Sequence, residues 1–96
     1  MREPDDADLL TLQELSRALA LAPDWVAERV RAGLIEVAAP AGDATAWRFD
    51  ALLVRRVRSM RQTERCYGAV PELAALVADL EEEIAALRRR VSRMPR

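Results

Sequence analysis

Residues 71–93 have the sequence PELAALVADLEEEIAALRRRVSR, and this stretch decides the architecture of the chain. Its spaced apolar residues follow one another at alternating steps of four and three: Leu73, Val77, Leu80, Ile84, Leu87 and Val91. Such steps place side chains on one side of a helix, in the a and d positions of a heptad repeat. The pattern predicts a single helix of about 23 residues, roughly 35 Å long, with a continuous apolar seam.

Charge is divided along this predicted helix. Acidic residues lie mainly in its first part, and arginines form its last turns: Glu72, Asp79, Glu81, Glu82 and Glu83, then Arg88, Arg89, Arg90 and Arg93. This order suits the helix dipole. A chain of 96 residues has too small a preceding domain to cover the seam. We therefore expect the seam to pair with a second copy, and the charge gradient favours an antiparallel pair. The alternative is a seam buried against its own domain.

The residues before this helix predict a compact domain over 11–68, preceded by a loose acidic segment over 1–10; residues 69–96 form the dimerisation segment. Thr11 and Glu14 have the spacing of a capping box and start a helix over about 12–20.

A second helix is predicted to begin at Pro23 and to end before Gly33, a residue suited to the C-terminal cap. Val26 and Val30 form its apolar side. Two short helices with a three-residue break between them are typical of a helix-turn-helix.

Two short segments, 34–37 and 46–49, are predicted to pair as a β-hairpin, called the wing here, because a turn-rich stretch separates them. Trp47 and Phe49 alternate with Arg48 and are expected to point inward. Asp50 is predicted to cap a third helix over about 51–65, whose core stripe is Leu53, Val57 and Met60, widened by Leu52 and Val54. The fold class is therefore mainly α, a winged helix-turn-helix followed by a long helix.

Composition excludes several function classes. The chain has no His and one Cys, so neither a His/Cys metal site nor a nucleophile paired with His can be built. We expect no catalytic residues, no metal and no cofactor. Cys66 is expected to be a half-buried packing residue. With no internal disulfide, no long apolar run and an acidic start unlike a signal peptide, the chain is expected to be cytoplasmic.

The net charge of −1 conceals an asymmetry between the two halves. Residues 1–50 hold 5 Arg and 10 Asp or Glu, a balance of −5, and residues 51–96 hold 10 Arg and 6 Asp or Glu, a balance of +4. An acidic first half favours a basic protein surface over nucleic acid as its partner.

The acidic candidates for such a contact are Glu14, Asp24, Glu28 and Glu36. Asp24 and Glu28 lie one turn apart on one helix face, and a carboxylate there can accept charge-assisted hydrogen bonds. Each also has a purely structural reading. Glu14 can serve only the capping box, Asp24 only the helix dipole, and Glu28 can pair with Arg31 or face water.

The whole layout resembles the MerR-like superfamily and, within it, the CbpM family of chaperone modulators. The resemblance lies in Leu10-Thr11-Leu12-Gln13-Glu14-Leu15, the acidic helix with Asp24 and Glu28, Gly33-Leu34-Ile35-Glu36, Trp47-x-Phe49-Asp50, Arg55-Arg56-x-Arg58 and the tail ending Arg90-Val91-Ser92-Arg93. It implies a non-enzymatic cytosolic homodimer. Such a protein binds the J-domain of a CbpA/DnaJ-like cochaperone and blocks its docking on DnaK.

A MerR-type DNA-binding regulator is the alternative. Its second helix would enter the major groove, and the candidate contacts are Arg29, Arg31, Arg48 and Arg55. The exposed N-terminal positions of a reading helix need Arg, Lys, Asn or Gln, whereas this chain has Asp24 and Ala27 there, with Glu28 next. We therefore do not expect nucleic acid to be the partner.

Overall fold

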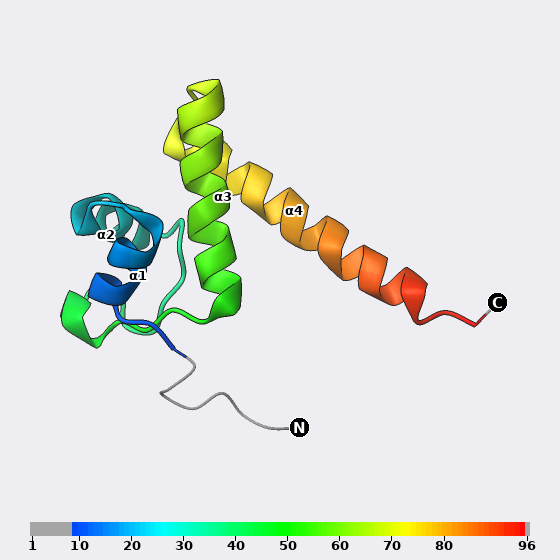
Figure 1. Cartoon of the computed structure of the whole chain (residues 1–96), viewed down its shortest axis with the longest axis horizontal. Helices are drawn as coiled ribbons and strands as arrows, with labels where there is room; N and C mark the ends of the chain where they lie inside the picture. Colours follow the sequence, from blue (N-terminus) through cyan, green and yellow to red (C-terminus); the bar gives the residue numbers. More distant parts are fainter. Residues whose placement is uncertain (1–8, 96) are drawn as a thin grey trace. The chain divides into compact units, whose positions relative to one another are not determined.

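The computed structural model of the chain describes residues 9–95. The described part is mainly helical. It contains four α-helices and one short 3-10 turn: α1 (Leu12–Leu19), α2 (Pro23–Arg31), η2 (Ala44–Ala46), α3 (Ala51–Tyr67) and α4 (Pro71–Ser92) (Figure 1). The predicted acidic lead-in falls almost entirely on residues 1–8, outside the described residues.

The chain divides into two compact units, Met1–Arg58 and Ser59–Arg96. The sequence places its boundary at 68/69, where the helical pattern breaks. The two compact units meet within α3, which runs without interruption from Ala51 to Tyr67 and so belongs to both.

The start of α1 is capped on both sides, as predicted. The Thr11 hydroxyl accepts a hydrogen bond from the Glu14 N–H at 3.1 Å, and Oε1 of Glu14 accepts one from the Thr11 N–H at 2.8 Å. Two backbone donors that a helix start leaves unpaired are thereby satisfied. The hydrogen bond that the Thr11 N–H donates to the carboxylate favours its ionised form and lowers the pKa of Glu14, with smaller contributions from the Thr11 hydroxyl and from nearby arginines.

Left-handed residues end α1 and α2. Ala20 has φ 55°, and the next N–H, of Leu21, donates to the carbonyl of Ser16 at 2.9 Å. Gly33 has φ 79°, and the Leu34 N–H donates to the carbonyl of Arg29 at 2.9 Å. A left-handed residue suits glycine and strains alanine, so the prediction of Gly33 as a cap is confirmed, while Ala20 carries a backbone cost.

The core of the first unit is built around two aromatic side chains. Trp47 and Phe49 are 1% and 0% exposed, so the prediction that both point inward is confirmed. They are buried together with aliphatic residues of α1, α2, the following loop and α3: Leu12, Leu15, Leu21, Val26, Val30, Ile35 and Val57. The indole Nε1 of Trp47 donates to the carbonyl of Ala39 at 3.3 Å, which satisfies its one polar group.

The predicted wing is not formed as a hairpin, since residues 9–95 contain no β-strand. Phe49 instead pairs with Leu10 in an isolated antiparallel bridge, through hydrogen bonds of 2.8 and 2.9 Å in the two directions. The Trp47 N–H is taken by the carbonyl of Ala44, and the carbonyl of Leu34 accepts from Nε of Arg56 at 2.8 Å. The backbone groups that the two strands would have shared are therefore bonded elsewhere.

The α3 helix begins as predicted, because Oδ1 of Asp50 accepts from the Leu53 N–H at 2.9 Å. It ends two residues later than expected, at Tyr67. Val57 and Met60 are fully buried, but Leu52 is 64% exposed and does not widen the core stripe. Cys66 is also exposed, contrary to the expectation of a packing residue, because it lies in the last turn of this helix.

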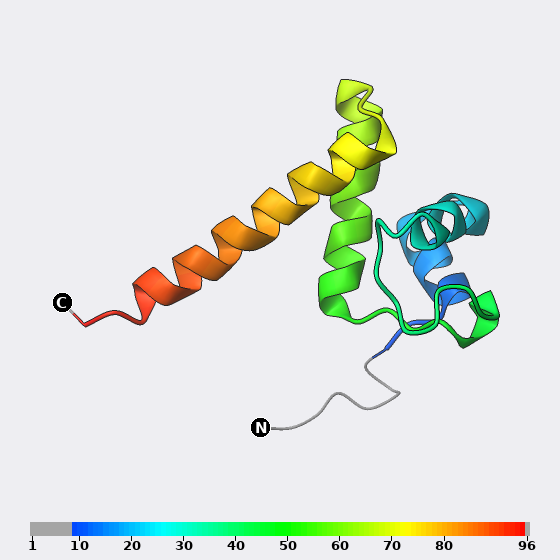
Figure 2. The same ribbon diagram turned by 180° about the vertical axis from the view of Figure 1, so that it is seen from behind.

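The α4 helix is one uninterrupted helix of 22 residues, as the sequence predicts (Figure 2). Its buried residues are small: Ala74, Ala75 and Ala78. Its first half shares a groove with the second half of α3 that Leu73 and Val77 help to line, and at one end of this groove the Ser59 hydroxyl donates a hydrogen bond to Glu81. The large apolar residues of α4 are left exposed.

Candidate functional site

Two surfaces carry the residues that the sequence singles out. The first is the solvent side of α2, called the acidic face and defined by Asp24 and Glu28, which are both exposed. The second is the apolar seam of α4, called the α4 seam and defined by Leu73, Val77, Leu80, Ile84, Leu87 and Val91. The two surfaces belong to different units of the chain.

The packing of α2 decides which of its side chains reach solvent. Val26, Ala27, Arg29 and Val30 are buried. Ala27 is one of the positions at which a helix that reads DNA bases would need an exposed polar side chain, and here it faces the interior. Arg31 is the remaining exposed charged residue of the helix. The solvent side of α2 therefore carries two carboxylates and one guanidinium.

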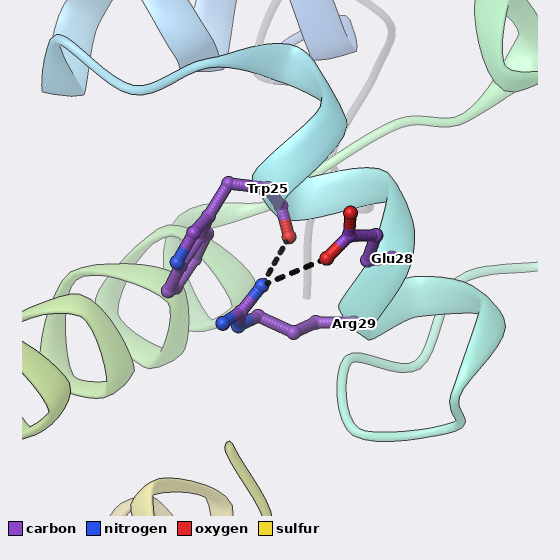
Figure 3. Close-up of polar contacts among 3 residues, drawn as sticks. All are labelled: Trp25, Glu28 and Arg29. Atoms are coloured by element: carbon purple, nitrogen blue, oxygen red, sulfur yellow. Dashed lines mark hydrogen bonds and ion pairs between the residues drawn. The ribbon is translucent and has the colours of Figure 1, made fainter. Parts of the chain in front are cut away.

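Arg29 is folded back onto its own helix (Figure 3). Its guanidinium donates to the carbonyl of Trp25 at 2.9 Å and lies 3.8 Å from the centre of the Trp25 ring. It is also 3.7 Å from the carboxylate of Glu28, a pair that replaces the Glu28–Arg31 pairing considered from sequence. Arg29 is only 8% exposed. This arginine therefore stabilises the helix and the indole, and it does not present its charge to a phosphate.

The other arginines of the DNA-binding alternative are only partly engaged. The Arg31 guanidinium lies 5.3 Å from the centre of the buried Trp47 ring. NH1 of Arg48 donates to the carbonyls of Thr45 and Trp47 at 2.9 and 2.8 Å. Arg55 is exposed on α3. Arg48 thus braces the loop that stands in place of the wing.

The remaining acidic candidates lie on other elements of the first unit. Glu14 is in the first turn of α1, exposed, with Oε1 already bonded to the Thr11 backbone. Glu36 is exposed in the irregular segment after α2. All four acidic candidates are exposed. The structure brings Asp24 and Glu28 together on one helix, whereas Glu14 and Glu36 come from separate segments.

The α4 seam is exposed along nearly its whole length. The exposed fractions are 49% for Leu73, 55% for Leu80, 47% for Ile84, 44% for Leu87 and 66% for Val91, while Val77 is half-buried. Exposed leucines scattered singly need no explanation, but a continuous stripe marks a surface for contact. Within the described residues the α4 seam is therefore a surface for contact, and the identity of its partner stays a prediction.

Sequence reasoning missed two features of α4 and the residues that follow it. Met94 lies two residues beyond the end of the helix, at the next step of the heptad spacing, and is 68% exposed. The buried alanines 74 and 78 lie four residues apart, on a different side of the helix from the seam. Both signals are present in the spacing, but Met94 lies beyond the last periodic step and alanine is uninformative about burial.

Comparison with protein-family models, with curated proteins and with solved structures finds no match to this chain. Within the described residues, no helix is both long and apolar enough to cross a membrane. The same residues contain no group of three or more metal-ligating side chains. The two surfaces consist of carboxylates on α2 and a row of aliphatic side chains on α4.

Proposed function

We propose that this chain is a non-enzymatic, cytoplasmic, homodimeric modulator that binds the J-domain of a CbpA/DnaJ-like cochaperone and blocks its docking on DnaK. The observation that carries the proposal is which charged side chains of α2 reach solvent. Its two carboxylates reach solvent, while its one buried arginine is bonded to the carbonyl and ring of Trp25.

The proposed chemistry is the pairing of opposite charges. By the resemblance to CbpM, the partner surface is a basic helix beside a His-Pro-Asp loop, the surface that DnaK itself uses. Asp24 and Glu28 accept charge-assisted hydrogen bonds from its basic side chains, which also speeds the encounter of the two proteins. Glu36 and Glu14 extend this charge beyond α2. Occupation of that surface excludes DnaK by competition.

The same proposal describes the first unit as a MerR-like helix-turn-helix. In it α1 and α2 form the two helices, and the irregular segment 34–49 occupies the place of the wing. The α4 seam is the proposed homodimer interface, because its side chains are the largest apolar groups that the helix leaves uncovered. No catalytic group, metal or cofactor takes part.

DNA binding is the alternative function with which the proposal is compared. Phosphate contacts dominate affinity for DNA, and carboxylates at the exposed start of a reading helix repel them. Arg29, the candidate closest to that face in sequence, is turned inward. The proposal therefore predicts weak DNA binding at physiological salt.

The decisive experiment is a calorimetric titration of the full chain with the J-domain of the CbpA-like cochaperone from the same organism, at moderate salt. The double variant Asp24→Arg/Glu28→Arg should weaken binding at least about tenfold, the size expected for charge pairs at an interface. Helical content, measured by circular dichroism, should remain unchanged because both side chains are exposed.

A matched control makes the same change in net charge on α4. The variant Glu72→Arg/Glu82→Arg should retain wild-type affinity for the J-domain. Equal losses in both variants would indicate only a long-range effect of net charge. Wild-type affinity in the α2 variant, or tight binding of the wild-type chain to a DNA duplex, would overturn the proposal.

A further inference from the structure

The heptad positions of the α4 seam residues define how a partner helix can lie on the seam. Val77, Ile84 and Val91 occupy the a positions of the heptad, and Leu73, Leu80 and Leu87 occupy the d positions. Aliphatic residues at a and d positions form the knobs-into-holes seam of a coiled coil. The occupant that this pattern fits is another helix with the same repeat.

We infer that the occupant is α4 of a second copy, packed antiparallel and offset toward the C-terminal half. In this offset pairing Leu80 faces Val91 of the second copy and Ile84 faces Leu87, while Val77 lies opposite the residues that follow the end of the second α4 at Ser92. Each layer occurs twice by symmetry, and each of these a residues meets a d residue, as an antiparallel pair requires. The overlap from Leu80 to Val91 is roughly 17 Å long. The inference rests on the homodimer proposed above and names its register.

The charges beside the seam select this offset. Glu81 and Arg88 occupy e positions, whereas Glu83 and Arg90 occupy g positions. In an antiparallel pair, e faces e and g faces g across the seam. The offset brings Glu81 opposite Arg88 of the second copy and Glu83 opposite Arg90. By symmetry the dimer gains four pairs of opposite charge.

Full antiparallel overlap is disfavoured for two reasons. It shifts the partner by one heptad. Glu81 then faces Glu81 of the second copy and Glu83 faces Glu83 of the second copy, so like charges lie together. It also brings Arg88 of the second copy toward Ala74. That alanine is already fully buried within the chain, so this flank of α4 has no room for an arginine.

A parallel, in-register pair is the third arrangement. It keeps attraction between Glu83 and Arg88 of the second copy, because g faces the following e in parallel coils. In that pair the position that would face Arg90 is residue 95, which lies beyond the end of α4 at Ser92, so Arg90 meets no acidic residue. Arg90 therefore distinguishes the two orientations: it pairs with Glu83 of the second copy only in the offset antiparallel dimer.

The test uses two charge reversals, Glu83→Arg and Arg90→Glu, prepared as separate full-length variants. In the offset dimer each variant alone places two like-charged pairs across the seam. When the two variants are mixed, both g–g contacts are again attractive. We expect each variant alone to dimerise about tenfold more weakly than the wild type, and the mixture to form heterodimers in about tenfold preference over homodimers.

Native mass spectrometry resolves the three dimers by mass, and sedimentation equilibrium at low salt gives their dissociation constants. Low salt is needed because exposed charge pairs are screened. The matched control pair is Glu82→Arg and Arg89→Glu, at f positions on the outer side of the helix, which should mix without preference. Mixing of Glu83→Arg with Arg90→Glu without preference would overturn the register.

The variant Leu80→Lys/Ile84→Lys separates this inference from the dimer itself. It should be monomeric, because it places charges in the central layers. A wild-type chain that is monomeric at the highest soluble concentration would overturn the dimer and the register together. A dimer that survives Leu80→Lys/Ile84→Lys would show that α4 is not the interface, whereas the J-domain titration is unaffected by either result.

Discussion

The first unit and α4 use apolar residues in opposite ways. In the first unit the largest apolar side chains, Trp47 and Phe49, are completely enclosed. In α4 the enclosed residues are alanines, and the leucines and isoleucine face outward. Since burial of a large apolar side chain contributes about 1.5–3 kcal/mol, a helix that exposes six of them leaves much stabilisation unused in the described structure.

This difference teaches where each part of the chain finds its stability. The first unit satisfies its helix ends with its own side chains and backbone: Thr11 and Glu14 at the start of α1, Asp50 at the start of α3, and Gly33 at the end of α2. In contrast, α4 begins at Val70 and Pro71 with no side-chain cap. Its stability depends on contacts along its length, and the large side chains of the seam are left largely exposed in the described structure.

Removal of a large side chain from each region tests this contrast most strongly. Phe49→Ala should reduce the free energy of unfolding by about 3–5 kcal/mol, because it leaves a cavity in a closed core. Ile84→Ala should change the stability of the monomer by less than about 0.5 kcal/mol, because that side chain is already half in water. Urea unfolding at a concentration below the dimer dissociation constant measures both.

Equal losses in these two variants would show that α4 is as closed as the first unit. In Phe49→Ala the change should also disturb the bridge to Leu10, which depends on the Phe49 backbone. Amide exchange at Leu10 reports that effect separately from global unfolding.

The end of α2 sharpens the comparison through the backbone. Gly33→Ala should destabilise the first unit by about 1 kcal/mol, because its φ of 79° is strained for alanine, while an added Cβ meets no atom within 4 Å. The reverse change, Ala20→Gly at φ 55°, should leave stability unchanged or raise it by up to about 1 kcal/mol. Thermal unfolding of the two variants gives opposite shifts if the caps act as described; parallel losses would contradict this.

The smallest expected effect is on the pH dependence of stability in acid, through Glu14 at the start of α1. The two Thr11 hydrogen bonds lower the pKa of Glu14 in the folded chain. A carboxyl whose folded pKa is depressed contributes stability that is present above its unfolded pKa, about 4.3, and is lost as the pH falls through the folded value. Glu14→Gln should therefore make unfolding less sensitive to pH below about 4.3, with little change at pH 7 because Gln also suits the capping box.

Unfolding curves of wild type and Glu14→Gln, measured between neutral pH and acid, provide the comparison. An identical slope of stability against pH in the two proteins would show that the capping box does not hold the charge of Glu14. Thr11→Val serves as the control, because it removes the hydroxyl that accepts from Glu14 while leaving its carboxylate in place.

Sequence alone predicted the helices well because the signals that start and stop them are local. Each of these signals acts within about four residues, so the order of residues in the sequence shows it. The signals are the capping box, the cap at Asp50, Gly33 and the two prolines at first helical positions. The inward direction of Trp47 and Phe49 also follows from a local alternation. The candidate acidic face follows from the same helical period, since Asp24 and Glu28 are one turn apart.

The prediction of the wing was wrong because the pairing partner of a backbone segment is not set by its neighbours in sequence. An alternating segment indicates that it has two faces, and it does not name the segment that takes its hydrogen bonds. Leu10, some forty residues earlier in the chain than Phe49, takes both bonds here. The burial of Arg29 could not be predicted from the sequence for a related reason. A charged residue is normally exposed, and the contacts with the Trp25 ring and carbonyl are what make its burial favourable.

The sequence by itself determined that residues 9–95 contain four α-helices, where these begin and end, and that the last one carries an unbroken apolar seam. These properties depend on residue type and spacing, which act over single turns of helix. Tertiary structure alone decided that α4 packs through alanines and leaves the seam exposed, that α2 shows its carboxylates and hides an arginine, and that segment 34–49 bonds to distant residues. Each of those outcomes is a choice among competing partners, and such a choice is made only when the whole chain is packed.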